Sequence, residues 1–363
     1  MTGLSLHEFH HSLNAAFTEV NGVEAVSHYG DGLAEHAALR AAAGVIDLGC
    51  RSRLCLTGAD RARFLHGQVT NNVKDLKAGQ GCYAALVTAK GKLQSDLNVY
   101  CLADELLLDF EPGLSAGVTE RFEKFIIADD VQVVDVAPHY GLLSVQGPKA
   151  AEVVARLGLG LSVPEEPLHF TKVVDATLGE VYCVNHARGL AAGCDLFVPT
   201  GALAAVADKL IAAAKEVGGR ACGWQALELV RIEAGIPRFG VDMDETNLAP
   251  EAGIEARAIS YSKGCYIGQE VIARIRTYGQ VAKALRGLIL PDDLRDLPAR
   301  GAKLFSGGKE VGVLTSAIAS PAFQRNIALG YVRREHHEPG AALHVQQGDR
   351  LFPATVTALP FRF

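Results

Sequence analysis

The most restrictive feature of the sequence is the change of pattern that follows Arg286. From there on, short apolar stretches are separated by Gly, Pro or Asp, and no helical repeat connects them. Short strands with turn residues between them are typical of sandwiches and small barrels. We therefore predict a separate all-β domain at 284–363, built from LRGLIL, EVGVLTSAI, NIALGYVRR, AALHVQ and PATVTAL.

The chain before about residue 240 mixes helices and strands in an irregular order. This predicts an α+β body with antiparallel sheets rather than a doubly wound parallel sheet. Leu203, Val206, Leu210, Ala214 and Val217 recur at helical spacing and predict one core-facing stripe. The expected helices span 34–43, 59–66, 115–128, 148–157, 202–217 and 223–234. Strands are expected in SRLCLT, LQSDLNVYCL, ELLLDF, VQVVDV, YGLLSV, KVVDATLGEVYCV and CDLFVP.

Composition and charge exclude several classes of protein. The 363 residues are enough for two or three domains, and 49% hydrophobic with 21% charged residues indicates a folded chain. The net charge of −6 provides no overall positive field for nucleic acid or an anionic membrane. No GxGxxG follows a predicted strand and no P-loop motif occurs, so dinucleotide and P-loop phosphate binding lack their usual signals.

The sequence also bears on location and metal content. We see no secretory signal at the N-terminus and no apolar run near the ~18 residues of a membrane span, so a cytoplasmic protein is expected. The eight cysteines include no CxxC pair, and we expect no metal centre and no disulfide scaffold. Cys55, Cys101 and Cys183 lie in apolar alternation and are predicted to be core thiols.

The segment SYSKGCYIGQEVIARIRTYG at 260–279 differs from the rest of the chain. Gly264 and Gly268 bracket Cys265, and QEVIARI has helical composition, which predicts a strand, a tight turn and a helix start. The positive end of that helix, with Lys263 two residues before the cysteine, would favour the thiolate and make Cys265 a candidate nucleophile or redox group. The alternative is a small buried hydrophobic residue at a turn.

Charges are unevenly distributed around this segment. Residues 257–286 hold six basic side chains and one acidic one, Glu270, which we assign to the first helical turn rather than to a general base. Residues 241–255 hold five acidic side chains and no basic one. The basic patch suits a small polyanionic ligand or an acidic partner, unless the two stretches pair with each other. Its members are Arg257, Lys263, Arg274, Arg276, Lys283 and Arg286.

Two aspartates in predicted strands are further candidates for a site. Asp96 lies in GKLQSDLNVY and Asp195 in AAGCDLFVP, both within alternating apolar sequence. A carboxylate on an inward strand face needs a partner or a ligand, whereas an exposed one needs neither. The residues alone leave both interpretations open at both positions.

The run KGCYIGQE at 263–270 resembles the signature of the YgfZ family of folate-binding proteins. That family shares its fold with the glycine cleavage T-protein, an aminomethyltransferase, and further blocks resemble this superfamily along nearly the whole chain. The blocks are EHAALRAAAGVIDLG, the stretch 57–100, LLSVQGPKA, ALELVRIEAGIPRFGVDMDE and the β segments that end in LPF.

The resemblance implies three lobes around a channel that binds tetrahydrofolate. The first α+β lobe would be discontinuous, from 1–50 and 137–240. The second would combine 51–136 with 241–283 and would carry the signature, and the third would be a β-barrel at 284–363.

The resemblance also implies folate contacts at single positions. Asp96 matches the T-protein carboxylate near the reactive folate nitrogens, and Tyr83 matches a channel aromatic. Asp195 stands where the T-protein has a glutamate that holds the pterin ring, and Arg231 is retained in VRIE. The chain departs from the T-protein at RGLAAG, which lacks an aromatic residue and a glutamate, and at a leucine that replaces an arginine before VRIE.

Three functions follow as hypotheses. The first is a tetrahydrofolate-binding accessory protein for assembly or repair of iron-sulfur enzymes, with Cys265 as its essential thiol and iron-sulfur client or assembly proteins as partners. The second is a folate-dependent aminomethyltransferase in which Asp96 orients the folate and stabilises charge. The third is a non-catalytic scaffold that docks an acidic partner through the basic patch. In the first, the motif or partner residues are Lys263, Gly264, Gly268, Gln269, Glu270 and Arg274.

Overall fold

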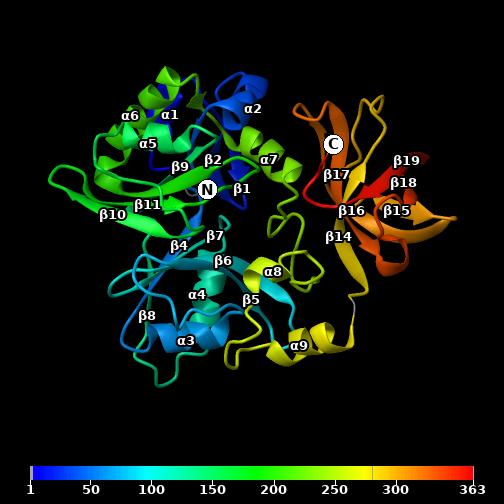
Figure 1. Cartoon of the computed structure of the whole chain (residues 1–363), viewed down its shortest axis with the longest axis horizontal. Helices are drawn as coiled ribbons and strands as arrows, with labels where there is room; N and C mark the ends of the chain where they lie inside the picture. Colours follow the sequence, from blue (N-terminus) through cyan, green and yellow to red (C-terminus); the bar gives the residue numbers. More distant parts are fainter. Residues whose placement is uncertain (1–2, 280, 363) are drawn as a thin grey trace. The chain divides into compact units, whose positions relative to one another are not determined.

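The computed structural model describes residues 3–279 and 281–362 (Figure 1). The chain forms two compact units, and neither is a continuous stretch of sequence. The first contains the residues up to Ala84 and Ser95–Val230, and the second contains Ala85–Gln94 and the residues from Arg231 onward. The three lobes with the boundaries given above stay a prediction.

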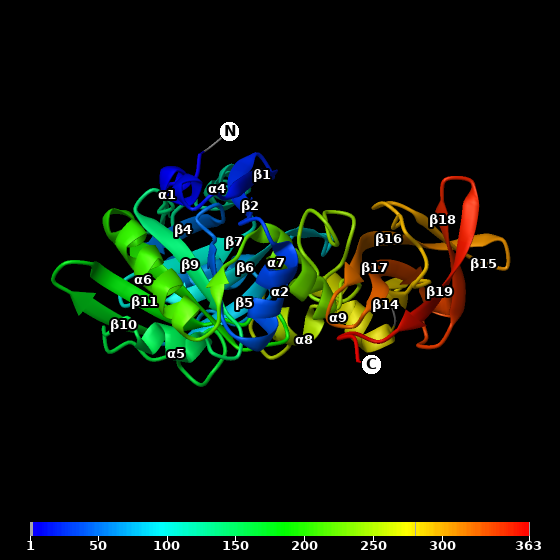
Figure 2. The same cartoon turned by 90° about the horizontal axis from the view of Figure 1, so that it is seen from above.

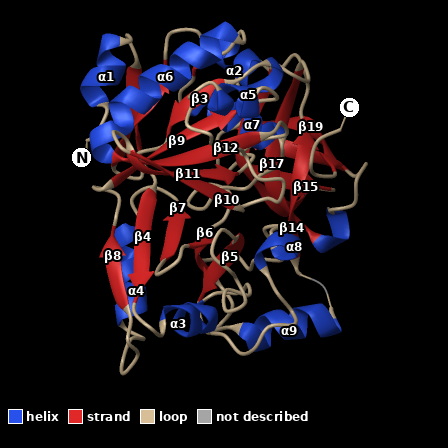
Figure 3. Cartoon of the chain, turned by 60° about the vertical axis from the view of Figure 1, so that its left-hand side comes forward, coloured by secondary structure: helices blue, strands red, loops and turns tan. Residues whose placement is uncertain are grey.

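In the first unit, a six-stranded sheet has one face covered by α5 (Ala150–Ala155) and α6 (Leu203–Glu216), as Figure 3 shows. The stripe predicted on the second of these helices is buried in this core, as its apolar spacing requires. The strands pair antiparallel, except that β13 pairs parallel with β3. Their order is β10 (Phe170–Asp175), β11 (Gly179–Asn185), β12 (Gly193–Pro199), β9 (Tyr140–Gln146), β3 (Gly44–Asp47) and β13 (Arg220–Ala221).

A five-stranded sheet lies against the other face of the first. Apolar residues of both sheets share one core, in which the rings of Tyr100 and Phe197 are 5.6 Å apart. The helices of this part are α3 (Arg61–Gln68) and α4 (Ser115–Glu123). The strand order is β5 (Gly81–Val87), β6 (Leu93–Cys101), β7 (Leu106–Phe110), β4 (Ser52–Thr57) and β8 (Gln132–Asp135).

Most predicted elements of this unit are present, with some differences. The run KVVDATLGEVYCV forms two strands, because Asp175 accepts hydrogen bonds from the N–H groups of Thr177 and Leu178 and closes a turn. The helix predicted at 115–128 ends at Glu123. Four elements near the N-terminus complete the unit: α1 (His7–Ser12), β1 (Ala16–Val20), β2 (Val23–His28) and α2 (Gly32–Ala41).

The second unit contains a closed six-stranded barrel, which confirms the predicted C-terminal β-barrel (Figures 1 and 2). Its interior is filled by branched apolar side chains such as Leu288, Leu304 and Val332. The order is β14 (Lys283–Ile289), β17 (Arg325–Arg333), β16 (Lys309–Ser320), β15 (Lys303–Ser306), β18 (Ala342–Gln347) and β19 (Arg350–Thr357). The barrel is preceded by α7 (Trp224–Glu233), α8 (Glu255–Ala258) and α9 (Gln269–Tyr278).

Taken together, these elements confirm the predicted α+β fold with a C-terminal β-barrel. Among the residues that the structure describes, no helix is both long and apolar enough to cross a membrane.

Candidate functional site

A row of polar side chains crosses three neighbouring strands of the five-stranded sheet. Asn98 on β6 pairs with Asp109 on β7. Two residues further, the same register places Asp96 opposite Glu111, directly after the end of β7. On the other side of β7, the β4 register places Arg51 opposite Glu111. Because side chains two residues apart share a strand face, these groups lie on one side of the sheet.

Arg51 neutralises two of these carboxylates. Its Nε donates to Asp109 Oδ1 at 2.7 Å and its Nη1 donates to Glu111 Oε1 at 2.7 Å, and all three side chains are buried. Burial alone would raise the pKa of Asp109, but the guanidinium groups of Arg51 and Arg188 outweigh it and hold that pKa below its usual value. The charges therefore persist in the interior because they are paired.

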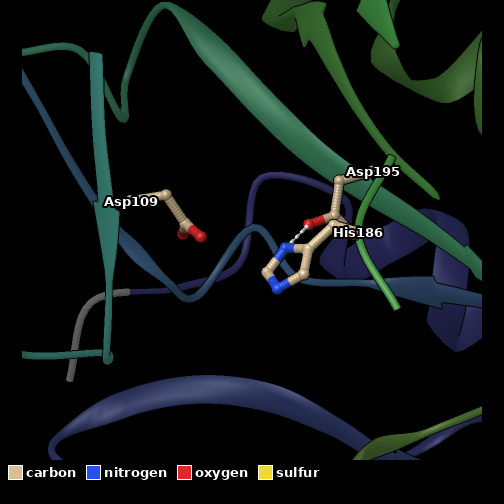
Figure 4. Close-up of side chains that lie close together, drawn as sticks. All are labelled: Asp109, His186 and Asp195. Carbon is tan, nitrogen blue, oxygen red and sulfur yellow. Dashed lines mark hydrogen bonds and ion pairs between the residues drawn. The ribbon is translucent and has the colours of Figure 1, made fainter. Parts of the chain in front are cut away.

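A second group of charged side chains lies on the facing six-stranded sheet. Asp195 on β12 is fully buried, and both of its oxygens accept hydrogen bonds from Arg188, at 3.2 and 2.6 Å. His186 Nδ1 lies 2.8 Å from Asp195 Oδ2 (Figure 4). Arg188 Nη2 is also 3.4 Å from Asp109 Oδ2, so this guanidinium joins the two sheets.

The electrostatics of this group favour an ionised aspartate beside a neutral histidine. Burial would raise the pKa of Asp195, yet Arg188 and His186 hold it far below its usual value. Burial, together with the positive charge of Arg188, lowers the pKa of His186, so its ring is neutral at pH 7.

The potential ligand atoms of Asp109, His186 and Asp195 lie within 4.8 Å of one another, which is close enough to hold a metal ion. However, Arg188 donates to both carboxylates of this trio. A guanidinium already supplies the positive charge that a cation would bring. We therefore interpret the trio as an ion-pair network.

Asp96 is the candidate of the sequence whose hydrogen bonding is incomplete. Tyr83 donates its hydroxyl hydrogen to Asp96 Oδ2 at 2.8 Å, while Asp96 Oδ1 is buried and has no hydrogen-bond partner among the residues that the structure describes. Burial, followed by the negative charge of Glu111, raises the pKa of Asp96 to about 6. Such a carboxyl group can accept a ligand N–H or stabilise a positive charge near neutral pH.

Arg231 lies in the second unit and has protein partners there. Its Nη1 pairs with the carboxylate of Asp242, and its Nη2 donates to Ser316 Oγ at 3.2 Å. Asp242 is completed by the hydroxyl groups of Thr315, at 2.6 Å, and Ser316, at 2.7 Å. These contacts attach the end of α7 to β16, and a folate contact by Arg231 stays a prediction.

The signature segment also lies in the second unit. Cys265 is exposed, in contrast to the buried turn residue of the alternative interpretation. Gly268 adopts φ +86° directly before α9, and a Cβ there would lie 2.5 Å from the carbonyl oxygen of Thr88, so only glycine fits. Lys263 is buried, with its ammonium group 4.8 Å from the centre of the Tyr266 ring.

Three members of the basic patch, Lys263, Arg276 and Lys283, lie over aromatic rings. Arg276 lies 3.9 Å from the centre of the Tyr261 ring, and the Tyr261 hydroxyl donates to the carboxylate of Glu255. On α9, Arg274 and Glu270 form an exposed pair at 3.7 Å, which contributes little to stability. The acidic and basic stretches are thus linked at Glu255 through an aromatic hydroxyl.

Five residues of the site are not predicted from the sequence. Asp109 and Glu111 do leave a signal, because ELLLDFE ends an apolar strand with two carboxylates two residues apart. The other three depend on tertiary contacts between segments that are distant in the chain. The five are Arg51, Asp109, Glu111, His186 and Arg188.

Comparisons with known proteins agree with this architecture. The family described as "GCVT N-terminal domain" matches residues 6–263, and "Glycine cleavage T-protein C-terminal barrel domain" matches 283–362. An aminomethyltransferase from Saccharopolyspora erythraea is 30% identical over 98% of this chain and 96% of that protein. One from Halothermothrix orenii is 27% identical over 98% of both.

A solved structure extends the likeness to the fold. The glycine cleavage system aminomethyltransferase T from Bartonella henselae aligns with a TM-score of 0.88 at 24% identity, over 99% of this chain and 98% of that one. Aminomethyltransferases of this family use tetrahydrofolate, which confirms the predicted cofactor. A ligand with ring N–H groups also fits the acceptor that Asp96 leaves open. With both of its parts matched, the chain belongs to the glycine cleavage T-protein family.

Proposed function

We propose that this protein is a folate-dependent one-carbon transferase of the aminomethyltransferase type, with Asp96 at the reacting end of the folate. One observation carries the proposal: Asp96 holds one oxygen toward Tyr83, and its other oxygen is buried without a partner in the described part of the chain. A buried acceptor without a donor is costly, and a ligand that brings an N–H or a positive charge removes that cost. The names of the relatives support the same activity.

The residues present suit this chemistry. When bound, tetrahydrofolate supplies the two nitrogens, one in the pterin ring and one in the neighbouring aryl amine, that take up the one-carbon unit. The Asp96 carboxylate accepts a hydrogen bond from the ligand and stabilises positive charge that develops beside it. Tyr83 fixes the orientation of that carboxylate through its 2.8 Å hydrogen bond. Burial, followed by the nearby charge of Glu111, raises the pKa of Asp96 to about 6, which is within reach of neutral pH.

The direct test is a transfer assay with purified protein. Lipoyl carrier protein charged with an aminomethyl group and tetrahydrofolate are added, and ammonia release is measured together with methylene-tetrahydrofolate. We expect turnover that requires both substrates. A protein that binds tetrahydrofolate yet releases no ammonia from the charged carrier would contradict the transferase proposal.

A second candidate is the accessory role in iron-sulfur enzyme maturation, as in the YgfZ family, and the exposed Cys265 in KGCYIGQE favours it. For this role, Cys265→Ala should abolish rescue of iron-sulfur enzyme activity in a deletion strain, because an exposed thiol is accessible to sulfur species or a partner. Cys101→Ala, at a half-buried thiol in the other unit, is the matched control and should rescue fully. Full rescue by both variants would eliminate this role for Cys265.

The scaffold hypothesis also remains a proposal, with the basic patch as the docking surface. Support for this role would come from an acidic partner that binds equally well with and without folate. The transfer assay and the rescue assay would then both be negative.

A further inference from the structure

Asp195 stands at the position where the resemblance implies a contact with the pterin ring. Both oxygens of Asp195 are engaged, by Arg188 at 3.2 and 2.6 Å and by His186 at 2.8 Å, and the side chain is fully buried. A ligand that took over this carboxylate would have to displace a guanidinium and leave it buried without its partner. That exchange is unfavourable, because an unpaired buried charge costs far more than one hydrogen bond returns.

Glu111 presents the opposite situation. Its side chain is also buried, with 7% of the residue exposed, and Arg51 holds Oε1 at 2.7 Å. Oε2, however, is buried and has no hydrogen-bond partner within residues 3–279 and 281–362. Arg51 therefore fixes the carboxylate in place while one acceptor is left for another group. Buried acceptors of this kind are rare in folded proteins and point to a missing donor.

The side chains of Glu111 and Asp96, each with one unpartnered oxygen, are neighbours on one face of the sheet. Continued two residues beyond the pair of Asn98 and Asp109, the strand register sets Asp96 opposite Glu111, and residues opposite each other in an antiparallel pair have Cβ atoms about 5 Å apart. Their electrostatic coupling agrees, since Glu111 contributes to the raised pKa of Asp96 after burial. Two like-charged carboxylates side by side favour a ligand that donates several hydrogen bonds.

We propose that Glu111, and not Asp195, receives the ring N–H donors of the ligand in this protein, as one half of a paired acceptor with Asp96. The inference rests on the proposed function for the identity of the ligand as a reduced folate. Because Arg51 holds Oε1, Glu111 offers the ligand one oxygen, Oε2, and Asp96 offers a second one, Oδ1. The class of ligand is therefore a flat heterocycle that carries more than one N–H donor. Arg188 keeps Asp195 occupied within the protein.

The test compares Glu111→Gln with Asp104→Asn. Glutamine keeps the shape of the side chain and an oxygen for Arg51. It replaces the free oxygen by an amide NH2 group, which cannot accept a hydrogen bond from an N–H of the ligand. The control removes an exposed carboxylate from the turn between the same two strands. Binding of tetrahydrofolate and of 6-methyltetrahydropterin is measured by anaerobic calorimetry. We expect about 10- to 100-fold weaker binding of both by Glu111→Gln, and unchanged binding by the control.

Further measurements keep the outcomes distinct. Glu111→Asp keeps the negative charge but retracts the oxygen, so it should fold normally, as checked by thermal unfolding, and still bind the tetrahydropterin more weakly. Binding of p-aminobenzoylglutamate, which lacks the pterin, should be the same in all variants. If folded Glu111→Gln and Glu111→Asp bind the pterin as well as the wild type does, the role of Glu111 is contradicted, whereas the proposed function is not. Failure of the wild type to bind either pterin would overturn the proposed function as well.

Discussion

Replacing Arg188 by methionine should lower the free energy of unfolding by about 3–5 kcal/mol at pH 7, as measured by urea denaturation. Arg188 is the buried cation that bonds both oxygens of Asp195 and approaches Asp109 Oδ2. Without it, the carboxylate of Asp195 keeps only the neutral His186 as a partner. The penalty arises from a buried charge left without its counterion, rather than from the loss of the pair as such.

A surface arginine provides the control for this prediction. Arg63 pairs with Asp129 at 2.6 Å but is largely exposed, so Arg63→Met should cost at most about 1 kcal/mol. The double variant Arg188→Met/Asp195→Leu should recover much of the lost stability, because both charges of the pair are removed together. Equal effects of Arg188→Met and Arg63→Met would contradict the buried network.

Asp96→Asn should lower the rate of one-carbon transfer by about 100-fold or more, because asparagine cannot stabilise a positive charge beside the folate nitrogens. The wild-type rate should rise as the pH increases through about 6, where Asp96 loses its proton. The variant should show no such rise. Asp135→Asn, at an exposed carboxylate on β8, should behave like the wild type.

Over the same pH range in which the transfer rate rises, the free energy of unfolding of the wild type should fall. The pKa of Asp96 is raised in the folded protein to about 6, from an ordinary value near 4. The protonated carboxyl therefore contributes stability that is fully present below about pH 4 and is lost as the pH rises through 6. At pH 7, Asp96→Asn should be more stable than the wild type, by up to about 3 kcal/mol. Undiminished transfer by a folded Asp96→Asn protein would remove this residue from the mechanism.

The sequence predicts those features of the fold that depend on local pattern. The strand and turn alternation after Arg286 is sufficient for a separate all-β domain, and its closure into a barrel is implied by the resemblance. The apolar spacing in α6 is sufficient for its buried stripe. The division of KVVDATLGEVYCV into two strands depends on one aspartate that closes a turn, which the apolar pattern on either side conceals.

The site is less accessible to prediction, because its charges are paired over long distances in sequence. Arg51 and Asp109 are 58 residues apart, and Arg188 and Asp109 are 79 apart. No local periodicity encodes such partners, and strand register is needed to see that Glu111 faces Asp96. The resemblance directs attention to Asp195, but only the structure reveals that Arg188 and His186 occupy its oxygens.

The tip of the β5–β6 hairpin, residues 85–94, belongs to the second unit, whereas the rest of the hairpin belongs to the first. In that unit, Gly268 is closely packed against Thr88 and Val87, and Gly91 lies against Val271. No single cut in the polypeptide can therefore separate the two units into intact pieces. A fragment that begins at Arg231 would contain the whole barrel but would lack the backbone on which the turn before α9 rests. We therefore expect the second unit to reach its native packing only when residues 85–94 are present with it.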